Sequence, residues 1–183
     1  DDETATVVAT KSPTTYENFA IGIFDCLSKV GLSPADIARI NHGTTLVINA
    51  LVQRAGARAA LLTTRGFRDV LEIARGNHAV PFALDYARDE PLIPRELRFE
   101  VSERMNARGE IVEPLDDADL HRLAERLREA DVEAVAICFL HAHVNAEHEQ
   151  RAAATLKALL PAVFVTYSTG LSGEAYEYER TST

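Results

Sequence analysis

Apolar and polar positions along this chain follow two periods, one typical of strands and one typical of helices. Residues 16–30 show the helical period, with apolar side chains at three- and four-residue spacing and Gly31 where the helix would end. Short β-branched runs between the helical segments predict strands. The predicted strands are residues 5–10, 37–42, 58–64, 134–140 and 162–167, and the predicted helices are residues 16–30, 44–54, 66–74, 116–130 and 146–160. This alternation predicts an α/β fold, in which helices connect the strands of a sheet.

The alternation is interrupted once, near the middle of the chain. Residues 76–94 show no period and contain three prolines, which predicts a long loop. Residues 98–104 and 110–113 flank a turn and predict a β-hairpin. We therefore expect one domain over residues 1–183, with the loop and hairpin of residues 76–113 as an excursion within it.

Composition narrows the class of protein. The chain has 183 residues, 46% of them hydrophobic, which is enough for one core. Its formal net charge of -9 repels phosphates, so nucleic acid is not an expected partner. Cys26 and Cys138 lie in apolar runs and are expected to be buried thiols. We find no signal peptide and no apolar run long enough to span a bilayer, and we expect a cytoplasmic protein without membrane contacts.

The tetrapeptide His42-Gly43-Thr44-Thr45 lies where a predicted strand passes into a predicted helix. Such a junction exposes backbone N–H groups at the positive end of the helix dipole, and threonine hydroxyls add further hydrogen-bonding groups. Asn49 lies one turn further along the same helix face. The pattern predicts a site for an anion or a carbonyl oxygen, and ordinary helix capping is the alternative.

A second strand-to-helix junction follows at residues 63–69, and aligned strand ends of a parallel sheet are where α/β proteins bind ligands. Arg75 and Asn77 stand at the end of the next predicted helix, beside the long loop. An arginine there is a candidate to hold a carboxylate or a phosphate, and a solvated arginine or one bonded to a carbonyl is the alternative.

Three histidines raise the question of a metal site. His141 and His143 follow a predicted buried strand, and His148 lies in the first turn of a predicted helix. Spacing of this kind is not diagnostic of zinc, so we expect no metal here.

Several segments together carry a family resemblance. They are residues 42–51, 63–73, 94–95, 98–101, 103–104, 109, 132–136, 139–141 and 177–183. Their combination resembles the N-terminal region of the hydantoinase A and 5-oxoprolinase family, and the similarity covers nearly the whole chain.

The resemblance implies a ribonuclease-H-like domain of the actin-like ATPase superfamily. Members of the family split cyclic amides such as hydantoins or 5-oxoproline with ATP and Mg²⁺, by activating a carbonyl oxygen through phosphorylation. Close relatives are subunits of ATP-dependent ketone carboxylases, and a second, hydantoinase B-like subunit is the usual partner. We expect His42, Thr44, Thr45 and Asn49 to be catalytic, Gly43 to contact the nucleotide, and Arg75 and Asn77 to bind substrate.

The sequence also departs from the family. Its members begin with strands that hold an Asp-x-Gly-Gly-Thr phosphate loop, and this chain has none. We therefore expect an incomplete domain that lacks its first strands and is inactive alone. A third hypothesis is a non-catalytic docking domain, in which residues 76–94 bind a partner.

Overall fold

A computed structural model describes residues 7–33, 35, 37–77, 82, 83, 85 and 89–183 of the chain. The chain packs as two compact units, residues 1–46 and residues 47–183. The assignment of both units to one partial domain remains a prediction.

The first unit is built around helix α1 (Phe19–Val30). The Asn18 side chain caps its start by accepting a hydrogen bond from Ala20 N at 3.0 Å, and Gly31 ends it in the left-handed conformation, with φ 73°. The predicted helix of residues 16–30 is thus confirmed, with a later start. None of the α1 residues is buried.

Two predicted strands of the first unit are wrong. Residues 37–42 form no strand in the structure, nor do residues 7–10, the described part of the predicted strand 5–10. A strand needs a neighbour with which to exchange backbone hydrogen bonds, and β-branched composition does not supply one.

The second unit contains a four-stranded parallel sheet with the strand order β2-β1-β5-β6. Its strands are β1 (Ala59–Thr64), β2 (Arg98–Val101), β5 (Ala134–Cys138) and β6 (Phe164–Tyr167). In register, Leu62 lies beside Phe99 on one side and Ile137 on the other. The α/β class with a parallel sheet is confirmed.

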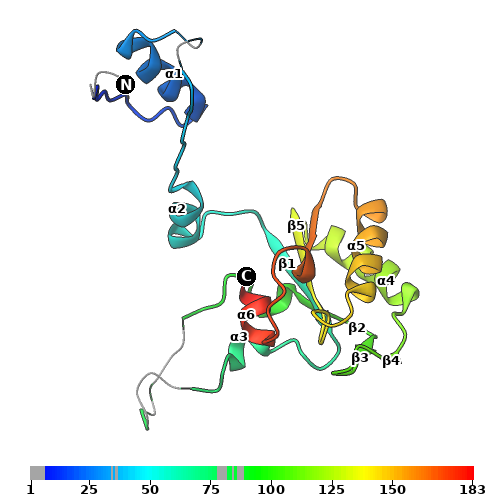
Figure 1. Cartoon of the computed structure of the whole chain (residues 1–183). Helices are drawn as coiled ribbons and strands as arrows, with labels where there is room; N and C mark the ends of the chain where they lie inside the picture. Colours follow the sequence, from blue (N-terminus) through cyan, green and yellow to red (C-terminus); the bar gives the residue numbers. More distant parts are fainter. Residues whose placement is uncertain (1–6, 34, 36, 78–81, 84, 86–88) are drawn as a thin grey trace. The chain divides into compact units, whose positions relative to one another are not determined.

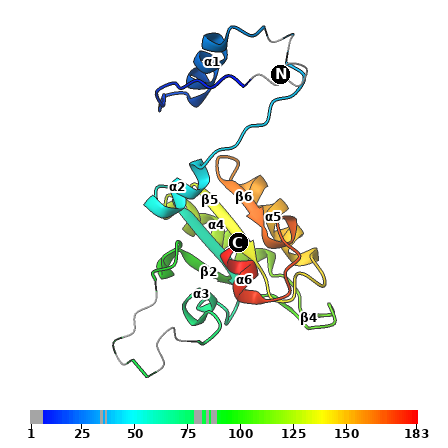
Figure 2. The same ribbon diagram turned by 60° about the vertical axis from the view of Figure 1, so that its left-hand side comes forward.

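Helices α4 (Asp117–Glu129) and α5 (Glu147–Leu159) cover one face of this sheet, and their buried side chains complete the core (Figures 1 and 2). The Asp116 side chain caps α4 by accepting a hydrogen bond from Ala118 N at 2.8 Å. The core residues of the two helices include Leu120, Leu123, Leu127, Ala152, Ala153 and Leu156.

Short helices and turns precede and follow these strands along the chain. Helix α2 (Leu46–Gln53) precedes β1, α3 (Val70–Ile73) follows it, and α6 (Glu177–Ser182) lies near the C-terminal residue. Figure 1 shows α3 and α6 on the side of the sheet away from α4 and α5. Two 3₁₀ turns, Arg95–Leu97 and Ser168–Gly170, adjoin β2 and β6.

The predicted hairpin is only partly present. Arg98–Val101, assigned to its first strand, pairs in parallel with β1 in the main sheet. The hairpin is formed by β3 (Arg104–Met105) and β4 (Ile111–Glu113) alone. A charged residue at position 98 suggests an exposed strand, but Arg98 is buried in the structure. Its guanidinium donates hydrogen bonds to Ile93 O at 2.9 Å and to Glu72 at 2.9 Å, which allow the charge to lie in the interior. The described residues of the predicted excursion therefore include a core strand.

Candidate functional site

Polar residues follow the carboxyl ends of the parallel strands. They are Thr64 at the end of β1, Ser102 and Glu103 after β2, His141 after β5, and Ser168 after β6. The carboxyl edge of a parallel sheet is the usual place for a ligand, above all where the strand order reverses. Here it reverses at β1, since the chain adds β2 on one side of β1 and later β5 on the other.

A buried hydrogen-bond network joins three of these strand ends. The Thr64 hydroxyl donates to Glu103 and accepts from Leu140 N at 2.9 Å. The other carboxylate oxygen of Glu103 lies 2.8 Å from His148 Nδ1 on α5. Glu103 and Thr64 are fully buried and His148 nearly so. The network fixes the ends of β1 and β5 against each other.

Glu149 forms a second buried centre. Its carboxylate accepts from Phe139 N at 2.9 Å and from the Ser168 hydroxyl at 2.6 Å. Its other oxygen accepts from Thr169 N at 3.0 Å and from the Thr169 hydroxyl at 2.8 Å. These four hydrogen bonds hold the ends of β5 and β6 to the first turn of α5, and they satisfy a carboxylate that would otherwise be costly to bury.

A third group surrounds Asp119 at the start of α4. Hydrogen bonds from the Ser102 hydroxyl, followed by those from Arg122 and Ser102 N, lower the pKa of Asp119 to about 2. Arg65, just after β1, donates to Ser102 and reaches Asp119 at 3.3 Å. The loops after β1 and β2 are therefore tied to α4 by charge.

Arg180 anchors α6 at the same edge. Its buried guanidinium donates to Phe139 O at 2.7 Å and to Glu177 at 2.5 and 2.8 Å. It also lies 3.0 Å from His143 Nδ1, and burial together with this positive charge lowers the pKa of His143. Burial raises the pKa of the neighbouring Cys138 thiol, as expected for an unreactive buried cysteine.

The residues of the predicted catalytic junction lie in an exposed segment at the start of α2. His42, Gly43, Thr44, Thr45 and Asn49 are all exposed. The Thr44 hydroxyl accepts from Leu46 N at 3.2 Å and so caps α2. Thr44 therefore has the helix-capping role that was the alternative interpretation. A catalytic role for the residues of this junction remains a prediction.

Arg75 and Asn77, predicted to bind substrate, lie in the second unit just after α3 and are exposed. Arg75 has partners within the protein: its guanidinium donates to Glu179 and lies 5.6 Å from the centre of the Tyr176 ring. These contacts join the end of α3 to α6.

The three histidines have separate roles in the structure. His148 bonds to Glu103 inside the core, and the ring centres of His141 and His143 lie 6.2 Å apart at the edge. His141 adopts φ 58°, in the left-handed region, so the chain bends just after the strand. In the part of the chain that the structure describes, no group of three or more His, Cys, Asp or Glu side chains could hold a metal ion.

The sequence did not predict the buried hydrogen bonds of Glu103, Glu149 and Arg180. A signal was present, because Glu103 closely follows the apolar strand residues Phe99 and Val101, and Glu149 begins an apolar helix face. A charged residue at such a place needs partners, but the sequence does not name them.

The fold defines an α/β protein with a parallel sheet whose carboxyl edge carries polar residues. Residues 1–160 match the model of the hydantoinase/oxoprolinase N-terminal region. The chain belongs to that family, as its motifs indicated. None of the helices among the described residues has the length and apolar character that a bilayer span requires.

Two relatives and one solved structure show the similarity in detail. The chain is 36% identical to the caprolactamase subunit alpha of Pseudomonas jessenii, over 100% of this chain and 28% of the relative. It is 31% identical to the acetophenone carboxylase gamma subunit of Aromatoleum aromaticum, over 94% of this chain and 26% of the relative. The crystal structure of the ATP-dependent caprolactamase from Pseudomonas jessenii matches with a TM-score of 0.83 and 34% identity, covering 96% of this chain and 27% of that one. The chain thus spans little more than a quarter of the length of these relatives.

Proposed function

We propose that this chain is the N-terminal region of an ATP-dependent amidohydrolase that opens cyclic amides. The observation that carries the proposal is the 36% identity to a caprolactamase subunit along the whole chain. Membership of the family and the caprolactamase structure at a TM-score of 0.83 support it. The wider actin-like ATPase assignment belongs to the same proposal.

In the proposed site, the segment that starts α2 binds oxygen atoms at the reacting centre. Thr44 and Thr45 bring hydroxyls to the N-terminus of an eight-residue helix, and Gly43 lets a ligand approach the backbone closely. His42 stands beside them as a candidate acid or base, and Asn49 adds an amide one turn further on. Arg75 and Asn77, in the second unit, are proposed to bind substrate, and Arg75 would then have to share its guanidinium with Glu179.

The residues present fit one phosphoryl or carbonyl group rather than a whole nucleotide. No lysine or arginine occurs between Arg39 and Arg54 to neutralise a triphosphate. Bound ATP with Mg²⁺ would supply the phosphoryl group that activates the amide carbonyl. The α2 segment would orient the amide oxygen and stabilise the charge that develops on it.

A second candidate function is favoured by a specific observation, the 31% identity to an acetophenone carboxylase subunit. Both relatives are named as subunits, so we also propose that the whole protein works with a second subunit of the hydantoinase B type. ATP turnover by that complex with caprolactam, hydantoin or 5-oxoproline supports the hydrolase. Turnover only with acetone or acetophenone plus bicarbonate would replace it by a carboxylase, and no turnover with either set would favour a docking domain.

Thr45→Ala in the whole enzyme tests the proposed site. A cap hydroxyl contributes about 1 kcal/mol to folding, whereas a donor aimed at developing charge contributes about 3 kcal/mol to the barrier, a loss of roughly 100-fold in kcat. We expect that loss with little change in melting temperature. Thr10→Ala, at an exposed position, is the control. A kcat within about twofold of the unmodified enzyme would mean that Thr45 is not catalytic.

A further inference from the structure

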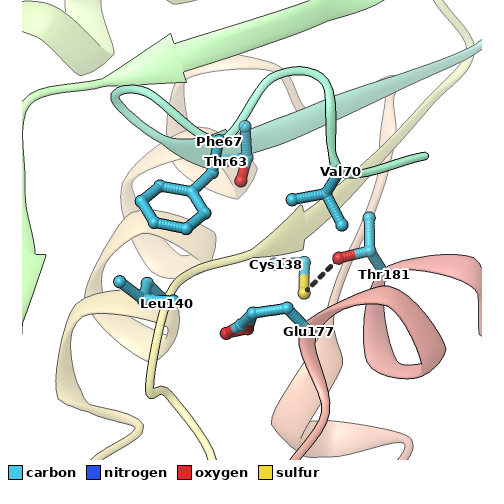
Figure 3. A pocket seen from close by; sticks show the side chains of 7 residues that line it. All are labelled: Thr63, Phe67, Val70, Cys138, Leu140, Glu177 and Thr181. Carbon is cyan, nitrogen blue, oxygen red and sulfur yellow. Dashed lines mark hydrogen bonds between the residues drawn. The ribbon is translucent and has the colours of Figure 1, made fainter. Parts of the chain in front are cut away.

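Helix α6 is held at the end of β5 by polar contacts. Of its six residues, only Arg180 is buried. The Arg180 guanidinium donates to Phe139 O at 2.7 Å and to Glu174 O at 3.0 Å. The Thr181 hydroxyl is directed to Cys138 Sγ at 3.3 Å (Figure 3). Because so short a helix is not stable by itself, the position of α6 depends on these hydrogen bonds, above all on those of Arg180.

One acceptor of Arg180 is lost when it takes up a proton. Arg180 Nη1 lies 3.0 Å from Nδ1 of His143, in the turn after β5. A guanidinium can only donate, so His143 accepts this hydrogen bond through an unprotonated Nδ1. Protonation would place an N–H group and a second positive charge against Arg180, and the attraction would become a repulsion. The buried Nε of Arg180 has no hydrogen-bond partner in the described part of the chain, so the guanidinium is already short of one acceptor.

The surroundings of His143 favour its neutral form. Burial and the charge of Arg180 oppose a proton on its ring, and so does His141, whose ring centre lies 6.2 Å away. Glu177 and Glu174 favour a proton, but burial and Arg180 dominate and hold the pKa of His143 below its ordinary value of 6.5. When α6 leaves, both effects weaken and the pKa returns toward 6.5, so the detached state binds the proton more readily. The attachment of α6 is therefore complete above pH 6.5 and weakens as the pH falls below it.

We propose that His143 and Arg180 form a pH-sensitive latch, which holds α6 at the end of β5 while His143 is neutral and releases it when His143 is protonated. Release also separates Glu179 of α6 from the Arg75 guanidinium, to which it now bonds. Arg75, at the end of α3, then loses its carboxylate partner and becomes available to another anion. The inference concerns the movement of α6 and does not require the proposed reaction.

The test is amide hydrogen exchange of the 183-residue chain between about pH 7.5 and about pH 5.5, expressed as protection factors to remove the intrinsic effect of pH on exchange. The amides of Arg180 and Thr183 report on α6, because they donate to Tyr176 O and Glu179 O. Release takes up one proton, so their protection should fall by about fivefold over this range. The amide of Leu160, which donates to Leu156 O at the end of α5, should keep its protection.

Variants of His143 separate the latch from a general effect of acid. His143→Asn keeps a neutral acceptor near the place of Nδ1 and cannot be protonated, so its α6 protection should not depend on pH. His143→Lys carries a permanent charge, and at about pH 7.5 it should show the low protection that the unmodified chain reaches at about pH 5.5. His121→Asn, at an exposed position on α4, is the matched control and should keep the pH dependence.

Four outcomes overturn the proposal. They are α6 protection that does not change with pH, an equal loss of protection at Leu160, a pH dependence that persists in His143→Asn, and full protection in His143→Lys at about pH 7.5. Loss of the dependence in His141→Asn alone would assign it to the other histidine and overturn the latch as well. Asparagine tolerates the left-handed backbone at position 141, so that variant keeps the turn. These measurements use neither ATP nor substrate, so the proposed function is tested separately.

Discussion

Replacing Glu149 by glutamine tests how strongly the carboxyl edge of the sheet depends on one buried carboxylate. Glu149 is fully buried and accepts four hydrogen bonds, from Phe139 N, the Ser168 hydroxyl, Thr169 N and the Thr169 hydroxyl. Glutamine keeps one oxygen but turns an NH₂ group toward two of the donors. Two hydrogen bonds to a charged acceptor are then lost, each with a net contribution of roughly 1.5–3 kcal/mol. Allowing for relaxation, Glu149→Gln should destabilise the chain by about 3 kcal/mol.

Urea unfolding followed by far-UV circular dichroism measures this loss, because the chain has no tryptophan to report by fluorescence. With a urea dependence of about 2 kcal/mol per molar, the midpoint should fall by about 1.5 M. Glu147→Gln is a matched control, since Glu147 lies in the same first turn of α5 and is exposed. That change removes only an interaction with the helix dipole, about 0.5 kcal/mol.

Equal unfolding midpoints of the two variants would contradict a supporting role for Glu149. A midpoint shift of less than about 0.3 M for Glu149→Gln, which corresponds to about 0.6 kcal/mol, would contradict it as well. Either result would mean that the four contacts of Glu149 do not hold the strand ends in solution.

Two further predictions concern pH and association. The pKa of Asp119 is about 2 in the folded chain against an ordinary value of 3.8, so its contribution of up to about 2 kcal/mol is complete above pH 4 and is lost as the pH falls through 2. The difference in urea midpoint between the unmodified chain and Asp119→Asn should therefore shrink from pH 7 toward pH 3, and a constant difference would contradict the assignment. Exposed apolar side chains on α1 and α2, such as Phe24 and Val52, should make the isolated chain self-associate, so its light-scattering mass should rise with concentration. A constant mass across a dilution series would rule this out.

The sequence predicted the elements of the second unit better than those of the first, for a physical reason. In residues 117–160 the helical period and the apolar strand reflect a core that the chain completes itself, and α4, β5 and α5 lie where the pattern placed them. Residues 37–42 carry the composition of a strand, yet they have no strand to pair with in the described part of the first unit. The local sequence pattern indicates which secondary structure a segment can adopt. Whether a strand forms depends also on a second strand with which it can pair.

Two further elements, β2 and α3, could not be predicted correctly from the sequence pattern. A buried arginine looks like a solvated charge in sequence, so β2 was assigned to a hairpin instead of the sheet. The predicted helix of residues 66–74 shrinks to four residues, because Phe67 N closes a turn onto Thr64 O after Gly66, which has φ 89°. The family could be recognised from the motifs. The hydrogen-bond partners of Glu103 and Glu149 could not be predicted, because they are distant in sequence. His148 lies 45 residues after Glu103, and Ser168 and Thr169 lie 19–20 residues after Glu149.

The distribution of hydrogen-bond partners separates scaffold from chemistry in this molecule. At the carboxyl edge, the side chains of Thr64, Glu103 and Glu149 bond to neighbouring side chains and to backbone groups, which makes the edge rigid and leaves those side chains little capacity for a ligand. The start of α2 differs, because His42, Gly43 and Thr44 are exposed there. The rigid carboxyl edge therefore acts as scaffold, and the exposed segment at the start of α2 is where we propose that chemistry takes place.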